Sequence, residues 1–314
     1  MSRDPRPPFD ARRAEGAAAL DLGLVVAAHG RHAIVETPEG QRMRCHPRGK
    51  RSELVVGDRV RWQPSGDEGV VESIEPRRNL LFRQDEWRSK SFAANLDQML
   101  LLVAVEPVFG ESQLARALIA AAAAGIRALI GLNKIDLPAA AEARARLAPY
   151  RAMGIEVLEF SAKADSTATR ALLQQRLADR ATLVLGPSGA GKSTLINLLV
   201  PQARAQVGEL SAALASGRHT TTSTTWYWLD ADRRGAVLDS PGFQEFGLQQ
   251  IEPQRLAELM PDLAAELGHC RFGNCTHRQE PQCGVHAAVQ DGRISASRWR
   301  IYRELYEELS RPRW

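Results

Sequence analysis

The sequence predicts a multidomain protein with a small N-terminal β-barrel, a central α/β domain built on a parallel sheet, and a mainly helical C-terminal module. Three observations predict this fold class. Short β-type runs separated by turn residues occupy positions 21–83. Strand-like and helix-like segments then alternate over 84–252, after a connecting stretch at 84–95. Positions 253–314 hold polar, helix-like segments on either side of a cluster of cysteines and a histidine.

Composition narrows the class of protein. The 314 residues are 44% hydrophobic, yet no run of eighteen apolar residues occurs, and the arginine-rich start lacks the apolar core of a signal sequence. We therefore expect a soluble, cytoplasmic protein with no membrane partner, and nothing in the sequence indicates an obligate dimer, so we expect a monomer. The net charge of +4 decides little by itself.

The barrel is predicted from four runs, GLVVAA, HAIVET, RVRWQP and GVVESIEP, with turn signals between them. They suit a five-stranded barrel of the oligonucleotide-binding (OB) type, and an SH3-like barrel would look similar. Residues 41–51 hold five basic and no acidic residues and are expected to form an exposed loop, in which Cys45 has no metal role. Residues 1–20, rich in Arg, Pro and Ala, are expected to form a flexible tail.

A phosphate-binding loop is predicted at 186–193, GPSGAGKS, because it lies between strand-like ATLVL and helix-like TLINLLV. Its glycines let backbone N–H groups approach phosphates, Lys192 would reach the β and γ phosphates, and Ser193 would ligate Mg²⁺. The expected nucleotide contacts are Gly186, Pro187, Ser188, Gly189, Ala190, Gly191, Lys192, Ser193 and Thr194.

The base is expected to be guanine. Asn133, Lys134, Ile135 and Asp136 follow strand-like RALIGL, and the carboxylate of Asp136 can accept both the N1 and N2 protons of guanine, an arrangement that adenine lacks. Asn133 would hold the loop together and contact the ring. After strand-like GIEVLEF come Ser161, Ala162 and Lys163, where a backbone N–H can donate to guanine O6.

A third phosphate element, DSPG, begins at Asp239, which would hold Mg²⁺ through water, while the N–H of Gly242 would sense the γ phosphate. The polar segment 217–223 is expected to supply a Mg²⁺-binding threonine, Thr221; a Ser/Thr-rich turn is the alternative.

Many GTPases place a water-orienting glutamine directly after this motif, where the present chain has Phe243. We therefore expect His219 to position water, the alternatives being a structural or an RNA-contacting histidine.

The order of these motifs is a circular permutation of the usual one, because the guanine motifs precede the phosphate loop. Such an order is physically acceptable if every motif follows a strand at the carboxyl edge of one parallel sheet. The permutation also brings the γ-phosphate sensor next to the C-terminal module, and we expect nucleotide state to reposition that module.

A metal site is predicted from Cys270-x4-Cys275-x-His277-x5-Cys283. Three thiols and one imidazole give the closed tetrahedral set of a single structural zinc, with His269 as a possible substitute for His277.

Together, the barrel, the permuted GPSGAGKST, GRHTTT and DSPG motifs and the cysteine cluster resemble the small-ribosomal-subunit-dependent GTPases, the RsgA family, over about 21–300. The resemblance implies binding to the 30S subunit during late maturation, contact with 16S rRNA, and subunit-stimulated hydrolysis of GTP with Mg²⁺. Potassium activation is not expected, because Gly189 stands where related permuted GTPases have an asparagine.

Two other functions fit the residues. One is a GTPase acting on another RNA, such as a tRNA-directed or translation-factor-like enzyme. The other is an RNA-binding protein that uses GTP as a structural ligand with negligible turnover, an alternative that Phe243 leaves open.

Overall fold

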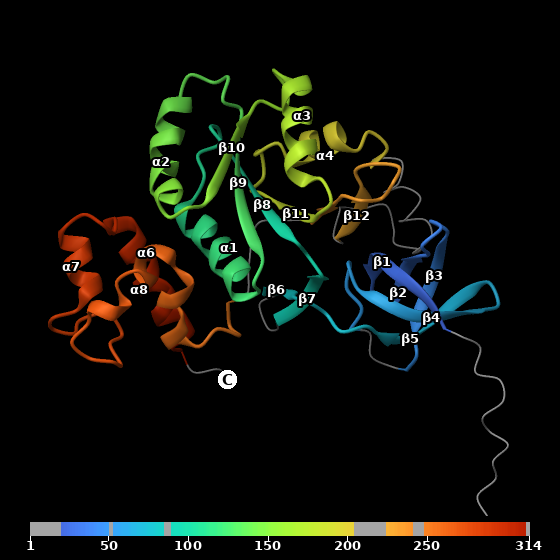
Figure 1. Cartoon of the computed structure of the whole chain (residues 1–314), viewed down its shortest axis with the longest axis horizontal. Helices are drawn as coiled ribbons and strands as arrows, with labels where there is room; N and C mark the ends of the chain where they lie inside the picture. Colours follow the sequence, from blue (N-terminus) through green and yellow to red (C-terminus); the bar gives the residue numbers. More distant parts are fainter. Residues whose placement is uncertain (1–19, 50–52, 85–88, 204–223, 241–247, 312–314) are drawn as a thin grey trace, which may run out of the picture.

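The computed structural model describes residues 20–49, 53–84, 89–203, 224–240 and 248–311. The barrel and the C-terminal module lie on opposite sides of the molecule, with the α/β domain between them (Figure 1). No helix in these described ranges is long and apolar enough to cross a membrane. The segment expected to be a flexible tail falls almost entirely outside them.

Five strands close into the N-terminal barrel. Their order is β1-β2-β3-β5-β4, and a further β1–β4 pairing closes the circle, with β3 and β5 parallel and the other pairs antiparallel. This closed five-stranded barrel confirms the OB-type prediction. The strands are β1 Asp21–His29, β2 His32–Glu36, β3 Arg42–Pro47, β4 Arg59–Ser65 and β5 Glu68–Ile74.

The expectation of an exposed loop at 41–51 was wrong, because residues 42–47 form strand β3. Met43 and Cys45 pack against the barrel core, which includes Val35 and Trp62, and the basic side chains occupy the alternate positions. The period of two was present in the sequence, but the arginines obscured it. Cys45 is a fully buried core residue, and burial raises the pKa of its thiol to about 12.

A hairpin of β6 Leu80–Gln84 and β7 Ser89–Ala94 follows the barrel and forms its own two-stranded sheet. The stretch at 84–95, expected only to connect two domains, thus contains a strand. The hairpin is fixed to the barrel by Asn95, whose Nδ2 donates to the carbonyl of Gly57 at 2.8 Å, and by a bridge between Val56 and Ala93.

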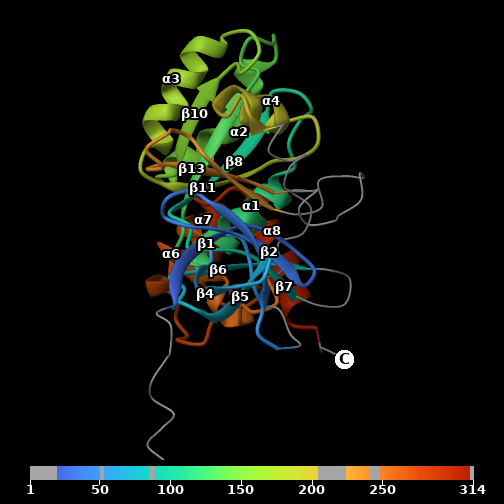
Figure 2. The ribbon, with the colours of Figure 1, turned by 90° about the vertical axis from the view of Figure 1, so that its right-hand side faces the viewer.

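The α/β domain has five parallel strands and one antiparallel strand, in the order β10-β9-β8-β11-β13-β12. The antiparallel strand β12 also pairs with β1, so the sheet continues into the barrel. Figure 2 shows the barrel next to β11 and β13. The strands are β8 Gln98–Ala104, β9 Arg127–Asn133, β10 Glu156–Phe160, β11 Ala181–Leu185, β12 Thr225–Trp228 and β13 Ala236–Asp239.

Helices cover both faces of this sheet. On β8, Met99 and Leu101 pack with the cluster that contains α1 and α2, whereas Leu100 and Leu102 pack with the cluster that contains α3 and α4. Every residue of β8 is buried, which explains the unbroken apolar run of the sequence. The helices are α1 Glu111–Ala123, α2 Ala140–Ala152, α3 Ser166–Leu177 and α4 Lys192–Leu199.

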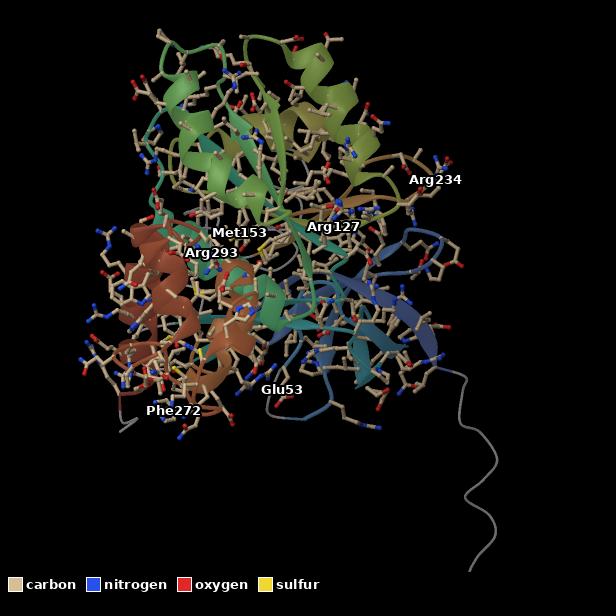
Figure 3. All side chains as sticks on the ribbon, turned by 60° about the vertical axis from the view of Figure 1, so that its left-hand side comes forward. Glu53, Arg127, Met153, Arg234, Phe272 and Arg293 are labelled. Carbon is tan, nitrogen blue, oxygen red and sulfur yellow. The ribbon has the colours of Figure 1, made fainter. Side chains whose placement is uncertain are left out.

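The C-terminal module packs on the α1 and α2 side of the domain and shares its hydrophobic core. The buried Arg298 donates to both carboxylate oxygens of Asp262 (2.8 and 2.9 Å) and lies near the ring of Tyr150 from α2. Phe272 lies at the outer end, away from the central domain (Figure 3). The elements are η2 Pro253–Arg255, η3 Ala257–Leu259, α6 Pro261–Ala264, η4 Leu267–His269, α7 Gly284–Gln290 and α8 Ala296–Leu309.

Candidate nucleotide site and metal centre

Four predicted motifs meet at the carboxyl edge of the parallel sheet. Strand β9 ends at Asn133, β10 at Phe160, β11 at Leu185 and β13 at Asp239, and one motif begins at the end of each strand. Within the strand order, β10 and β9 lie together, and β11 and β13 lie together on the other side of β8. The guanine motifs and the phosphate motifs therefore form adjacent halves of one site, whatever their order in the chain.

The side-chain amide of Asn133 joins these halves. It is 3% exposed, and its Nδ2 donates to the carbonyl of Ala190 in the phosphate loop at 2.9 Å. Its Oδ1 accepts from the backbone N–H of Lys134 at 2.8 Å and from that of Ala162 at 3.0 Å. A single buried amide thus holds three motif loops in fixed relative positions.

Asp136 projects from this edge with an exposed side chain. Ser161 orients it, because the Ser161 hydroxyl donates to Asp136 Oδ1 at 2.5 Å and accepts from the Asp136 N–H at 3.1 Å. Lys134 has a left-handed backbone (φ 65°) and its Nζ donates to the carbonyl of Glu106 at 2.6 Å. Lys163 is exposed, whereas Ile135 packs partly buried against the core.

The phosphate loop connects β11 to the first residue of α4. Gly191 has φ 96°, and a Cβ added to it would lie 2.4 Å from Asn133 Nδ2; one added to Gly186 would lie 2.6 Å from the carbonyl oxygen of Leu102. Both positions therefore admit only glycine. The side chains of Ser188, Ser193 and Thr194 are exposed at this edge, and Pro187 is partly exposed.

Lys192 Nζ forms an ion pair with Asp239 Oδ1, and both side chains are largely buried. The lysine was predicted to bind phosphates and the aspartate to hold Mg²⁺. The structure brings these two groups of opposite charge to the same point. Next to them, the buried hydroxyl of Thr224 donates to Ser240 Oγ at 3.3 Å. The other residues assigned to hydrolysis, His219, Thr221 and Gly242, lie outside the described residues, as does Phe243.

The predicted metal ligands converge in the C-terminal module. One donor atom from each of Cys270, Cys275, His277 and Cys283 lies within 4.8 Å of the others. Cys270 Sγ is 3.4 Å from His277 Nδ1 and 4.0 Å from Cys283 Sγ. Three sulfur donors and one imidazole within this distance can hold a metal ion, and they fit the tetrahedral set of zinc. His269, the possible substitute, instead contacts Glu266 at 3.2 Å with a mostly exposed side chain.

Burial disfavours charge at this centre. Burial raises the pKa of the Cys275 thiol to about 12, and the neighbouring thiols add to this shift. Burial also lowers the pKa of His277. A bound cation would favour the thiolate forms and offset the cost of burying them.

The comparisons with known proteins agree with this geometry. The model of the RsgA GTPase family matches residues 74–249. The small ribosomal subunit biogenesis GTPase RsgA of Variovorax paradoxus (strain S110) is 61% identical over 300 residues, 94% of each chain. The chain belongs to the RsgA GTPase family. The RsgA protein of Bordetella pertussis is 52% identical over 93% of this chain and 97% of its own.

Two solved structures extend the likeness to the whole fold. YjeQ from Thermotoga maritima superposes with a TM-score of 0.71 at 29% identity, covering 93% of this RsgA-family chain and 99% of its own. YloQ, described as a circularly permuted GTPase, has a TM-score of 0.69 at 26% identity, covering 97% and 100%. The permuted order expected from the motifs is confirmed.

Sequence reasoning missed Glu280, which folds the loop between Cys275 and Cys283. Its carboxylate accepts from the N–H and hydroxyl of Thr276 (2.8 and 2.5 Å) and from the N–H groups of Arg278 (2.9 Å) and Gln279 (3.1 Å). Burial opposes the charge, but these hydrogen bonds, led by that of Thr276, lower the pKa of Glu280. The sequence did offer one signal for Glu280: it is an acidic residue among turn residues between two metal ligands.

Replacing Gly191 by Ala is expected to lower affinity for GDP and GTP alike by about tenfold or more, because the new methyl group displaces Asn133. Fluorescence titration with labelled nucleotides measures the loss. Gly154→Ala is the matched control: its φ of 80° imposes similar backbone strain, but nothing lies within 4 Å of the added Cβ. Equal affinity in the two variants would mean that the contact with Asn133 is unimportant.

Proposed function

We propose that this protein binds the small (30S) ribosomal subunit and hydrolyses GTP to GDP and phosphate as a late step of subunit maturation, with turnover stimulated by the subunit. The observation that carries the proposal is the buried amide of Asn133, which joins a guanine-reading loop to a phosphate loop at one sheet edge. The relatives named as small ribosomal subunit biogenesis GTPases, which align along nearly the whole chain, support the ribosomal part.

Guanine would be read by Asp136, whose carboxylate is held by Ser161 and accepts the N1 and N2 protons of the base. A backbone N–H of the SAK motif would donate to O6; the N–H of Ala162 already donates to Asn133 Oδ1, which fixes this loop. Adenine offers the carboxylate no such pair of donors, so the site selects GTP over ATP.

Hydrolysis depends on where this chain places charge around the phosphates. Mg²⁺ bound with GTP would neutralise the β and γ oxygens, with Ser193 and Asp239 near it. Lys192 would then turn from Asp239 to the phosphates, so the ion pair seen in the structure opens when GTP binds. The backbone N–H groups of the glycine-rich loop complete the cradle.

One structural zinc at the four-residue metal centre would stabilise the C-terminal module. The segment around the centre contains short turns rather than long helices, so it has little hydrophobic core of its own. Surrounding groups already orient the ligand loop: Trp299 Nε1 donates to the carbonyl of His277 at 3.3 Å, and the Tyr302 hydroxyl donates to that of Thr276 at 2.8 Å.

Contact with 16S rRNA would use cationic groups at both ends of the molecule. In the barrel, Arg48 and Arg61 are exposed beside single carboxylates. In the module, Arg278 stacks on Tyr306 at 4.6 Å and Arg303 on Trp299 at 4.9 Å. Because Tyr306 is buried, the guanidinium groups rather than its ring would contact RNA phosphates. We propose that the protein acts as a monomer in the cytoplasm.

The base assignment predicts a change of specificity. In Asp136→Asn, GTP affinity is expected to fall about a hundredfold, because charge-assisted hydrogen bonds are lost. Xanthosine triphosphate, whose O2 can accept from the new amide, should bind the variant better than GTP does. Competition against a labelled nucleotide measures both affinities, with the exposed Asp67→Asn as the control. Unchanged preference for GTP in Asp136→Asn would contradict the assignment.

The metal assignment predicts one zinc per chain in native mass spectrometry. Cys283→Ser should lower zinc affinity by at least about a hundredfold and make residues 270–283 exchange their amide hydrogens faster. Cys45→Ser, which changes another buried cysteine, should keep its zinc. Full zinc content in Cys283→Ser would rule out the proposed ligand set.

The proposed function is tested by GTP hydrolysis with and without purified 30S subunits. We expect stimulation of about tenfold or more, since a partner that completes a GTPase site acts on the transition state. Lys192→Ala, measured in parallel, reports contaminating GTPases. Stimulation by tRNA but not by 30S subunits would favour an enzyme acting on another RNA, and absence of turnover under every condition would favour a GTP-liganded RNA-binding protein.

A further inference from the structure

One short hairpin, β12–β13, separates the barrel from the nucleotide site. Ala27 of β1 pairs with Thr225 of β12, Thr225 pairs with Asp239 of β13, and Asp239 pairs with Val184 of β11. These four residues form one continuous row across the sheet, from the barrel to the strand that enters the phosphate loop. Asp239, whose carboxylate pairs with Lys192, therefore lies on β13, and only β12 separates that strand from β1 of the barrel.

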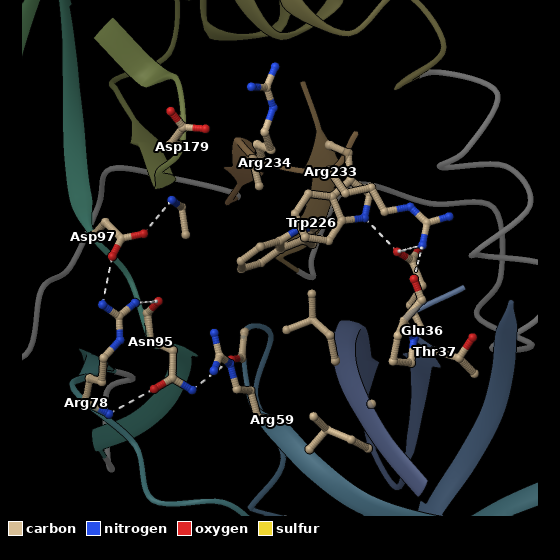
Figure 4. Close-up of a pocket in the computed structure, with 18 residues that line it drawn as sticks. Glu36, Thr37, Arg59, Arg78, Asn95, Asp97, Asp179, Trp226, Arg233 and Arg234 are labelled. Atoms are coloured by element: carbon tan, nitrogen blue, oxygen red, sulfur yellow. Dashed lines mark hydrogen bonds and ion pairs between the residues drawn. The ribbon is translucent and has the colours of Figure 1, made fainter. Parts of the chain in front are cut away.

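The turn end of the same hairpin is clamped to the barrel (Figure 4). Trp228 Nε1 donates to Glu36 Oε1 at 2.6 Å, and Glu36 is 4% exposed. Arg233, in the turn of the hairpin, donates to the carbonyls of Pro38 at 3.1 Å and Glu39 at 3.2 Å, and lies 3.8 Å from Glu36. We call these contacts of Glu36, Trp228 and Arg233 the clamp.

Two features indicate that the clamp is a specific contact. Arg233 has a left-handed backbone with φ 54°, a conformation that residues other than glycine adopt only at a cost in free energy. A Cβ added to Gly40 would lie 1.5 Å from its guanidinium, so the arginine rests directly on glycine backbone. Beside the clamp, a cavity of about 630 Å³ lies between the barrel and the α/β domain and is lined by residues of both, such as Leu24 and Ala236.

The hairpin contacts the barrel near both of its ends, through the pairing of Thr225 with Ala27 beside Asp239 and through the clamp at its turn. Asp239 pairs with Lys192 in the structure, and it would face Mg²⁺ instead when GTP binds. If an element can take two arrangements, a contact that fixes one of its ends shifts the equilibrium between them.

We propose that Glu36 and Arg233 are positioning residues that act on the nucleotide site through the β12–β13 hairpin. By clamping the hairpin to the barrel, they hold Asp239 where it can face Mg²⁺, so the Mg²⁺-dependent part of GTP binding depends on the barrel. The inference rests on the role proposed above for Asp239. By thermodynamic reciprocity, an RNA that displaces β2 alters GTP affinity, and GTP alters RNA affinity.

The test is equilibrium binding of a fluorescent, non-hydrolysable GTP analogue over a series of Mg²⁺ concentrations. In Arg233→Ala, the Mg²⁺ concentration for half-maximal binding is expected to rise about three- to tenfold, the usual range for coupling through a packed network. GDP affinity measured without Mg²⁺ should not change, a result that general damage to the fold would not give. Trp228→Phe, which removes the indole donor to Glu36 and keeps an aromatic ring at this position, should shift in the same direction.

Arg234→Ala is the matched control, because the exposed guanidinium of this neighbouring arginine forms its one ion pair within the described residues with Asp232, at 3.5 Å. It should leave the Mg²⁺ dependence unchanged. In nucleotide-free protein, amide exchange of residues 236–239 should be faster in Arg233→Ala than in Arg234→Ala.

Asp239→Asn, measured alongside, separates the two possible failures. If Asp239→Asn raises the Mg²⁺ requirement and the folded Arg233→Ala and Trp228→Phe variants do not, the clamp has no positioning role and the proposed function stands. If Asp239→Asn leaves the Mg²⁺ requirement unchanged, its proposed role is wrong, and the inference is overturned with it.

Discussion

The three hydrogen bonds of the Asn133 amide hold together loops that lie far apart in the chain. One bond reaches the phosphate loop and one the SAK loop, while the third stabilises the turn of the guanine motif itself. Because the amide is buried, water cannot replace a lost partner cheaply. The distance between the base site and the phosphate site therefore depends on this side chain, as does the need for glycine at 191. Permuting the chain leaves such a contact intact, since it depends only on neighbouring strands.

Features encoded locally could be predicted from the sequence. The phosphate loop and the cysteine cluster are recognised from the spacing of their residues, and the fully buried strand β8 is recognised from its run of apolar residues. Strand β3 was missed because Arg42 and Arg44 dominate its composition, although Met43 and Cys45 keep the alternation. The pairing of β12 with β1 was not predicted, because it joins residues nearly two hundred positions apart. The contacts of Glu280 and Arg233 depend on how loops fold, which the spacing of motifs does not determine.

The order of motifs suggested that nucleotide state acts on the C-terminal module, whose first residues follow DSPG. In the structure, that module shares a hydrophobic core with α1 and α2, and Arg298 is buried at the junction. The barrel contributes Val26, Ile34 and Val56 to the same core, and it is also attached through one strand pairing and a polar clamp that lies beside a cavity of about 630 Å³. A contact rich in polar groups and open space changes more easily than a continuous apolar core. The clamp and the cavity are therefore the part of the barrel's attachment that can change most easily.

The position of β8 in the sheet also determines how this chain is assembled during translation. Within the α/β domain, strands β8, β9 and β10 leave the ribosome first and can form their half of the sheet, with β9 on one side of β8. The other edge of β8 stays open until β11 emerges some eighty residues later. Six of the seven residues of β8 are apolar, and an unpaired strand of this kind invites association with other chains. The nascent chain therefore passes through a stage in which the strands before the predicted guanine motifs are paired, the strand before the phosphate loop is missing, and β8 is open to association.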